Sequence, residues 1–102
     1  MLDEMRVEYR STLSGKFGEI EALWARIAQG SLCAESYDPL YRLVHTLAGS
    51  AKTFGLPAVS DAARVLELAL ESFEGRSGGI PADDAQRIGR LVERLVRSGG
   101  RR

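Results

Sequence analysis

Apolar residues recur at spacings of three and four over most of this chain, and this period restricts the fold more than any other feature. Such spacing places apolar side chains along one face of an α-helix. No segment shows the strict alternation and β-branched enrichment that is typical of strands. The pattern therefore predicts an all-α fold, with helices over about 15–29, 38–55, 57–74 and 81–97.

Four amphipathic helices joined by short loops are typical of an antiparallel four-helix bundle. Residues 1–13 are more weakly amphipathic, and Ser14 and Gly15 follow them. We therefore expect a short N-terminal helix that covers one end of the core and ends at this break. Residues 98–102 are expected to form a frayed tail.

The stretch from Asp38 to Gly55 is predicted to be one helix with a start and a stop. Asp38 can cap the first turn, and Pro39 fits the first helical position, which needs no amide donor. Gly55 can adopt the left-handed conformation that closes a helix. At 3.6 residues per turn, the apolar side chains share one face: Leu40, Leu43, Val44, Leu47, Ala51 and Phe54.

His45, the only histidine, falls on the opposite face of that helix and is expected to project into solvent. The residues three and four positions later, Ala48 and Gly49, are small. A glycine inside a helix costs about 1 kcal/mol relative to alanine. This cost suggests a surface kept open for close approach of a partner beside the imidazole.

The next predicted helix, over 57–74, separates its residues in the same way. Its apolar side consists of Val59, Ala62, Ala63, Leu66, Ala69, Leu70 and Phe73. Its polar stripe consists of Ser60, Arg64, Glu67, Glu71 and Glu74.

Length and composition exclude several classes of protein. The 102 residues suffice for one modest core, so residues 1–102 are predicted to form one domain with the bundle over 14–97. The formal net charge is zero, which argues against a nucleic-acid partner. The single cysteine, Cys33, excludes an internal disulfide and fits a reducing compartment. No apolar run approaches the ~20 residues that span a membrane, and no signal peptide is evident, so a cytoplasmic location is expected.

The sequence contains few of the residue patterns that a self-contained enzyme would need. With one histidine and one cysteine, a zinc site of the usual kind is improbable. No glycine-rich nucleotide loop occurs, so no ATP or NAD site is expected. A catalytic triad would need His45, and its own helix offers only Asp38, about two turns away, as a supporting acid. An exposed neutral imidazole can, however, act as a nucleophile toward a phosphoryl group that a partner presents.

The segment His45 to Gly55 resembles the signature helix of the histidine phosphotransfer (HPt) domains of bacterial multistep phosphorelays. The likeness rests on the histidine, the apolar residue two positions later, the small residues and the closing glycine: His45, Leu47, Gly49, Ser50, Ala51, Phe54 and Gly55. The segment Ala62 to Glu67 is also similar to the helix that follows in this family. The specific likeness covers His45 to Glu67, and the helix order agrees over nearly the whole chain.

This resemblance implies a phosphocarrier with His45 as the phosphorylated nucleophile. The partners implied are response-regulator receiver domains, with a phospho-aspartate, and a hybrid histidine kinase upstream. The chain itself would need no cofactor and no ATP, since Mg²⁺ belongs to the receiver domain. Transfer is expected at the outer ring nitrogen and in either direction.

The chain departs from the family pattern at Ala48, where a lysine is common. Lys52 is the first candidate for the missing charge, since side chains lean toward the N-terminus of a helix and a long lysine can reach back. Arg64 on the next helix is a weaker candidate. Tyr41, together with Ala48 and Gly49, is expected to border the surface that docks receiver domains. An ordinary solvated lysine remains an equal interpretation of Lys52.

Two other functions remain open. A non-catalytic interaction module would dock receivers without accepting phosphate, and Ala48 in place of lysine favours this alternative. A dimerising kinase domain would place its histidine in a bundle formed by two chains. This chain has enough predicted helices to form a bundle alone, so a monomer is expected.

Overall fold

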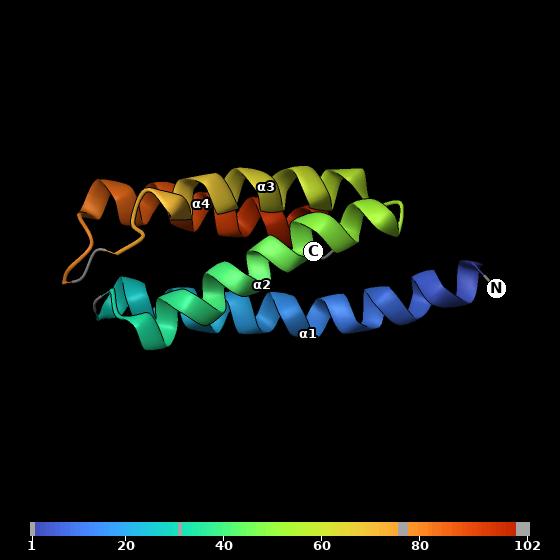
Figure 1. The fold of residues 1–102 in the computed structure, drawn as a ribbon, viewed down its shortest axis with the longest axis horizontal. Coiled ribbons are helices and arrows are strands. Elements are labelled where there is room, and N and C mark those ends of the chain that lie inside the picture. The colour runs from blue at the N-terminus through green and yellow to red at the C-terminus, as the bar shows by residue number, and fades with distance from the viewer. Residues whose placement is uncertain (1, 31, 76–77, 100–102) are drawn as a thin grey trace.

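The computed structural model describes residues 2–30, 32–75 and 78–99, with side chains from Thr12 onward. The described part of the chain contains four α-helices: α1 (Leu2–Gln29), α2 (Ala34–Thr53), α3 (Pro57–Glu71) and α4 (Ala82–Ser98). They lie side by side in an elongated bundle, in which α1 packs against α2 and α4, and α3 packs against α2 and α4 (Figure 1). The prediction of an all-α four-helix fold is confirmed.

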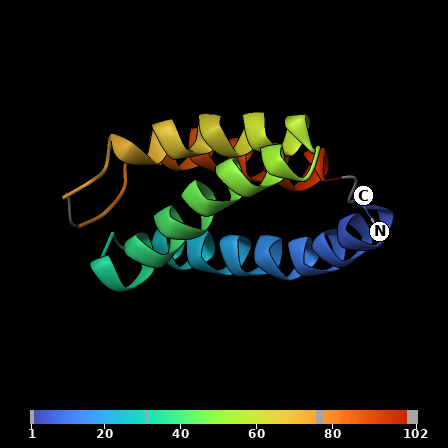
Figure 2. The same ribbon diagram turned by 45° about the vertical axis from the view of Figure 1, so that its right-hand side comes forward.

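Helix α2 occupies the central place in this arrangement. It runs obliquely from the end of α1 to the start of α3, as Figures 1 and 2 show. The middle of α2 faces α3. None of the helices in the described residues is long and apolar enough to cross a membrane.

The prediction of a separate N-terminal covering helix over 1–13 is wrong. Helix α1 continues through Ser14 and Gly15 without a break. The reason is that its apolar face keeps one register, because Leu13, Phe17, Ile20, Trp24 and Ile27 follow at spacings of four and three and are all buried. Ser14 and Gly15 fall on the exposed side, where a glycine weakens a helix without ending it.

The predicted start of the histidine helix is also wrong. Helix α2 begins four residues earlier than Asp38, at Ala34, and Pro39 lies inside it. The amides of Ser36 and Tyr37 bond to the carbonyl of Cys33, which closes the first turn. The buried Tyr37 side chain anchors this turn, because its hydroxyl donates to the carbonyl oxygen of Leu70 on α3 at 2.5 Å.

The predicted stop at Gly55 is confirmed. Gly55 has a φ of 75°, which is left-handed, and its amide bonds to the carbonyl of Lys52. The amide of Leu56 bonds to the carbonyl of Ala51 at 2.8 Å. These two bonds satisfy the last carbonyls of α2 and turn the chain directly into α3, which begins with Pro57.

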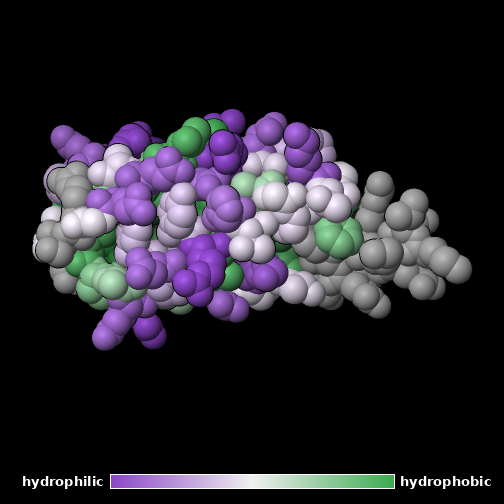
Figure 3. Space-filling model, in the orientation of Figure 1, coloured by the Kyte–Doolittle hydropathy of each residue, from purple (hydrophilic) through white to green (hydrophobic). Residues whose placement is uncertain are grey.

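The core lies between the apolar faces that the sequence predicts, and hydrophilic residues predominate on the face shown in Figure 3. Every apolar residue predicted for 57–74 is buried, including Phe73, which follows the end of α3. Four residues of the predicted apolar face of α2 are buried as well: Leu40, Val44, Leu47 and Ala51. Leu43 and Phe54 of that face are half-buried. Three polar residues are also buried: Ser36, Ser60 and Glu67. The last two belong to the predicted polar stripe, and both lie on the side of α3 that faces α2.

The tail predicted over 98–102 begins one residue later than expected, since Ser98 still belongs to α4. Residues 100–102 lie outside the described part of the chain, as do residues 76 and 77 of the glycine-rich loop.

Exchange of Gly55 for alanine tests the turn between α2 and α3. An L-residue in the left-handed region costs about 1 kcal/mol or more. We expect Gly55→Ala to lower the free energy of unfolding in urea by that amount. Gly49→Ala is the matched control: a Cβ at Gly49 meets nothing within 4 Å, and alanine is the better helix former. Equal stability of both variants would contradict this account of the turn.

Candidate functional site

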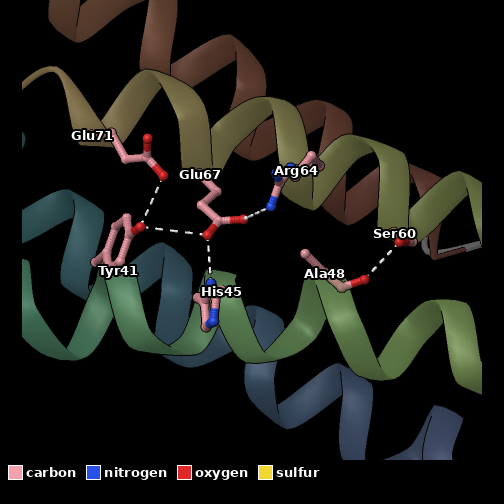
Figure 4. Close-up of polar contacts among 7 residues, drawn as sticks. All are labelled: Tyr41, His45, Ala48, Ser60, Arg64, Glu67 and Glu71. Carbon is pink, nitrogen blue, oxygen red and sulfur yellow. Dashed lines mark hydrogen bonds and ion pairs between the residues drawn. The ribbon is translucent and has the colours of Figure 1, made fainter.

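His45 lies in the middle of α2, on the edge that faces α3, and 64% of its side chain is exposed. The expected projection into solvent is therefore met for most of the ring. One ring nitrogen is nevertheless engaged: Nδ1 lies 2.5 Å from Oε2 of Glu67 on α3 (Figure 4). The imidazole is thus held from one side and open on the other.

Glu67 is the group that holds the ring, and only 2% of its side chain is exposed. Burial raises the pKa of this carboxyl, but the hydrogen bond and charge of His45, together with the Arg64 guanidinium, outweigh burial and hold the pKa below its ordinary value. Glu67 is then a carboxylate at neutral pH and can only accept hydrogen bonds. The proton between the two groups therefore lies on Nδ1, and in the neutral form of the ring the lone pair is on Nε2.

Arg64 lies one turn before Glu67 on α3. Its Nη1 is 3.3 Å from Oε1, the carboxylate oxygen that His45 does not use, and 63% of the arginine side chain is exposed. The two oxygens of one buried carboxylate are thus divided between an imidazole and a guanidinium (Figure 4). This division satisfies a charge that would otherwise be costly to bury.

Tyr41 precedes His45 by one turn on α2. Its hydroxyl donates to Oε2 of Glu71 at 2.9 Å and lies 3.4 Å from Oε2 of Glu67. The hydrogen bond to Glu71, with a smaller contribution from burial, raises the pKa of Tyr41 to about 12. The Tyr41 ring stacks on the His45 ring, with centroids 6.2 Å apart, and on Tyr37 at 6.1 Å. Tyr41 thus lies beside the imidazole on the side of the helix N-terminus.

An open hollow of about 400 Å³ lies on the other side of His45, between α2 and α3. We call it the histidine hollow, and its lining is His45, Ala48, Gly49, Lys52, Pro57, Ser60, Asp61, Arg64 and Glu67. The Ser60 hydroxyl donates to the carbonyl oxygen of Ala48 at 2.6 Å, which joins the two walls (Figure 4). Small side chains on the α2 wall leave room for a group attached to the ring.

The structure brings most predicted site residues to one place. His45, Ala48, Gly49, Lys52 and Arg64 line the histidine hollow, whereas Tyr41 flanks the ring on the opposite side, beside a second hollow with Tyr37, Asp38, Arg42 and Glu74.

Sequence reasoning missed the supporting acid. It sought that acid on the histidine helix and assigned Glu67 only to a polar stripe. A signal was present, because Glu67 lies four residues after Ala63 and three before Leu70, both buried, at the edge of the apolar face of α3.

Comparison with known protein families agrees with this geometry. The model of the Hpt domain matches residues 4–98. The chain belongs to the Hpt domain family. Hpt domains carry phosphoryl groups between proteins of phosphorelays, are intermediates and not kinases, and interact with receiver domains. No curated protein and no solved structure matches the chain.

No cluster of three or more His, Cys, Asp or Glu side chains that could hold a metal ion occurs among the described residues. Two of the acids near His45 are bonded to partners, since Glu67 binds His45 and Arg64, and Glu71 accepts from Tyr41.

Acid conditions test the electrostatics of the Glu67 carboxylate. Because its pKa is lower in the folded chain than its ordinary value of 4.5, its contribution to stability is present above that value and is lost as the pH falls through the lower, folded value. We expect the wild type to lose more of its free energy of unfolding than Glu67→Gln between about pH 6 and about pH 3, by urea titration. Parallel losses in the two proteins would contradict this assignment.

Proposed function

We propose that this Hpt domain accepts a phosphoryl group on Nε2 of His45 and passes it to and from the aspartate of response-regulator receiver domains. The group enters the relay from a hybrid histidine kinase. The observation that carries this proposal is the hydrogen bond between Nδ1 and Glu67, because it leaves the lone pair on the exposed ring nitrogen. A nucleophile held by a neighbouring base or acid is typical of covalent catalysis.

Transfer of the phosphoryl group to His45 needs no other reactive group of this chain. The Nε2 lone pair attacks the phosphorus of a receiver's aspartyl phosphate, an N–P bond forms, and the P–O bond breaks with its electron pair leaving on the aspartate. The Nδ1 proton stays in place, so the phosphorylated ring carries a positive charge. That charge faces the Glu67 carboxylate, 2.5 Å away. In the reverse step the ring leaves as neutral imidazole.

The receiver domain supplies the rest of the chemistry in this proposal. Phosphoryl transfer depends mainly on positioning and on stabilisation of charge, and Mg²⁺ on the receiver serves the second need. The docking surface consists of Tyr41, Ala48, Gly49 and Arg64 around the ring. Relay contacts form and release quickly, so we expect a small interface, below about 1,200 Å².

Lys52 is proposed to contribute positive charge near the phosphoryl group. It lines the histidine hollow, which supports the proposal, and its side chain is exposed. It lies seven residues after His45, about 10.5 Å along the helix axis, so its effect is expected to be long-range and sensitive to salt.

A non-catalytic docking module is the alternative function. Ala48, which brings no charge to the hollow, is the observation that favours it. The buried acid behind His45 favours the carrier, since a surface that only docks has no need for a carboxylate that fixes the ring proton.

We further propose that residues 1–102 act as one domain, as a cytoplasmic monomer. The histidine lies between two helices of a single chain, which supports this, whereas a dimerising kinase domain would form its bundle from two chains. Light scattering measures the mass directly, and a dimer would contradict the proposal.

Transfer of label tests the carrier. A receiver domain that bears ³²P is mixed with the wild type and with His45→Gln. We expect label on the wild type only, stable to base and lost in acid, as a phosphoramidate bond requires. Binding of several receivers without any transfer of label would favour the docking module instead.

The open surface at Gly49 gives a second test. A Cβ at Gly49 meets nothing within 4 Å, so Gly49→Gln is expected to fold normally and to slow transfer at least tenfold, by blocking the receiver. Gly18→Gln is the matched control, because Gly18 is also exposed, inside a helix and free of neighbours within 4 Å, but lies on α1. Equal transfer rates for the two variants would show that docking does not use the Gly49 surface.

A further inference from the structure

The contact of Arg64 with Glu67 leaves most of the arginine side chain open to solvent. The ion pair spans 3.3 Å, and 63% of the arginine side chain is exposed. A guanidinium carries five N–H donors, and the contact with Glu67 uses one of its nitrogens. Arg64 therefore has donors to spare, and it lines the histidine hollow.

A phosphoryl group on Nε2 would bring about two negative charges into this hollow. Ala48 offers no charge there, and Asp61 on the same lining is an acid. The positive side chains of the lining are Lys52 and Arg64. Lys52 is two turns along α2, whereas Arg64 reaches the same carboxylate that His45 contacts. A planar guanidinium also matches two phosphoryl oxygens at once, which an ammonium cannot do.

The charges around Glu67 explain how Arg64 becomes available. While the ring is neutral, Arg64 is a cation that contacts the buried carboxylate. Once Nε2 is phosphorylated, the ring keeps its Nδ1 proton and becomes cationic. The ring then neutralises Glu67 in place of Arg64, while the phosphoryl group requires a new cation beside it.

We propose that Arg64 changes partner on phosphorylation: it pairs with Glu67 in the free protein and with the phosphoryl oxygens in the phosphoprotein. This inference rests on the proposed function. It assigns to Arg64 on α3 the positive charge that Ala48 does not supply. It also means that the free and phosphorylated forms present different charge to a receiver, although the backbone is the same.

The equilibrium of phosphoryl transfer tests the exchange. ³²P is allowed to equilibrate between a receiver domain and the wild type, Arg64→Ala, Arg64→Lys and Lys52→Ala. We expect Arg64→Ala to shift the distribution toward the receiver by about fivefold, Arg64→Lys to restore part of the loss, and Lys52→Ala to have a smaller effect. Arg87→Ala is the matched control, since Arg87 forms an exposed ion pair with Asp84 on α4 and is expected to leave the distribution unchanged.

The distribution of label distinguishes the partner exchange of Arg64 from the carrier function. If the wild type takes up label and Arg64→Ala holds as much of it, the exchange of partners is wrong and the carrier function stands. If the wild type takes up no label, the carrier function fails and the exchange fails with it.

The NMR signal of the Arg64 side chain gives a second test, because a purely structural role of Arg64 would leave it unchanged. The ¹⁵N resonance of its guanidinium is expected to shift when His45 is phosphorylated with a small phosphoramidate donor, whereas that of Arg87 is expected to stay in place. An unchanged Arg64 resonance in the phosphoprotein would overturn the proposal.

Discussion

The burial of one carboxylate on α3 is the constraint on which the site depends. Glu67 is almost fully enclosed, and a charge in that position is tolerated only because positive or donating groups reach both of its oxygens. His45 and Arg64 are those groups. The same contact that satisfies the carboxylate also decides which nitrogen of the imidazole carries the proton. The hydrogen bond between His45 and Glu67 thus serves both the stability of the fold and the chemistry of the ring.

The helix pairing that brings Glu67 to His45 is set by local features of the chain. The left-handed turn at Gly55 sends α3 back along α2, and the bond from Ser60 to the carbonyl of Ala48 holds the two helices together beside the site. At the far end, Tyr37 bonds across to Leu70. Hydrogen bonds on both sides of His45 therefore limit sliding of α3, which would separate the acid from the ring.

Much of this structure was predictable, and the failures have physical causes. The all-α class, the core faces and the stop at Gly55 follow from spacing and from backbone preference, which act locally. The length of α1 was misjudged because Ser14 and Gly15 resemble a break, although a continuous apolar face outweighs two weak helix formers. Glu67 was misjudged because an acid at the edge of an apolar face can turn either way. Only the neighbouring helix, with His45 on it, decides that direction.

The position of the ring proton in the phosphoprotein tests the central claim most directly. A ¹⁵N spectrum of His45 after phosphorylation reports both ring nitrogens, through coupling to ³¹P at one and to a proton at the other. The account predicts phosphorus on Nε2 and the proton still on Nδ1, against Glu67. Phosphorus on Nδ1, or a phosphorylated ring without a proton on Nδ1 near pH 7, would contradict it.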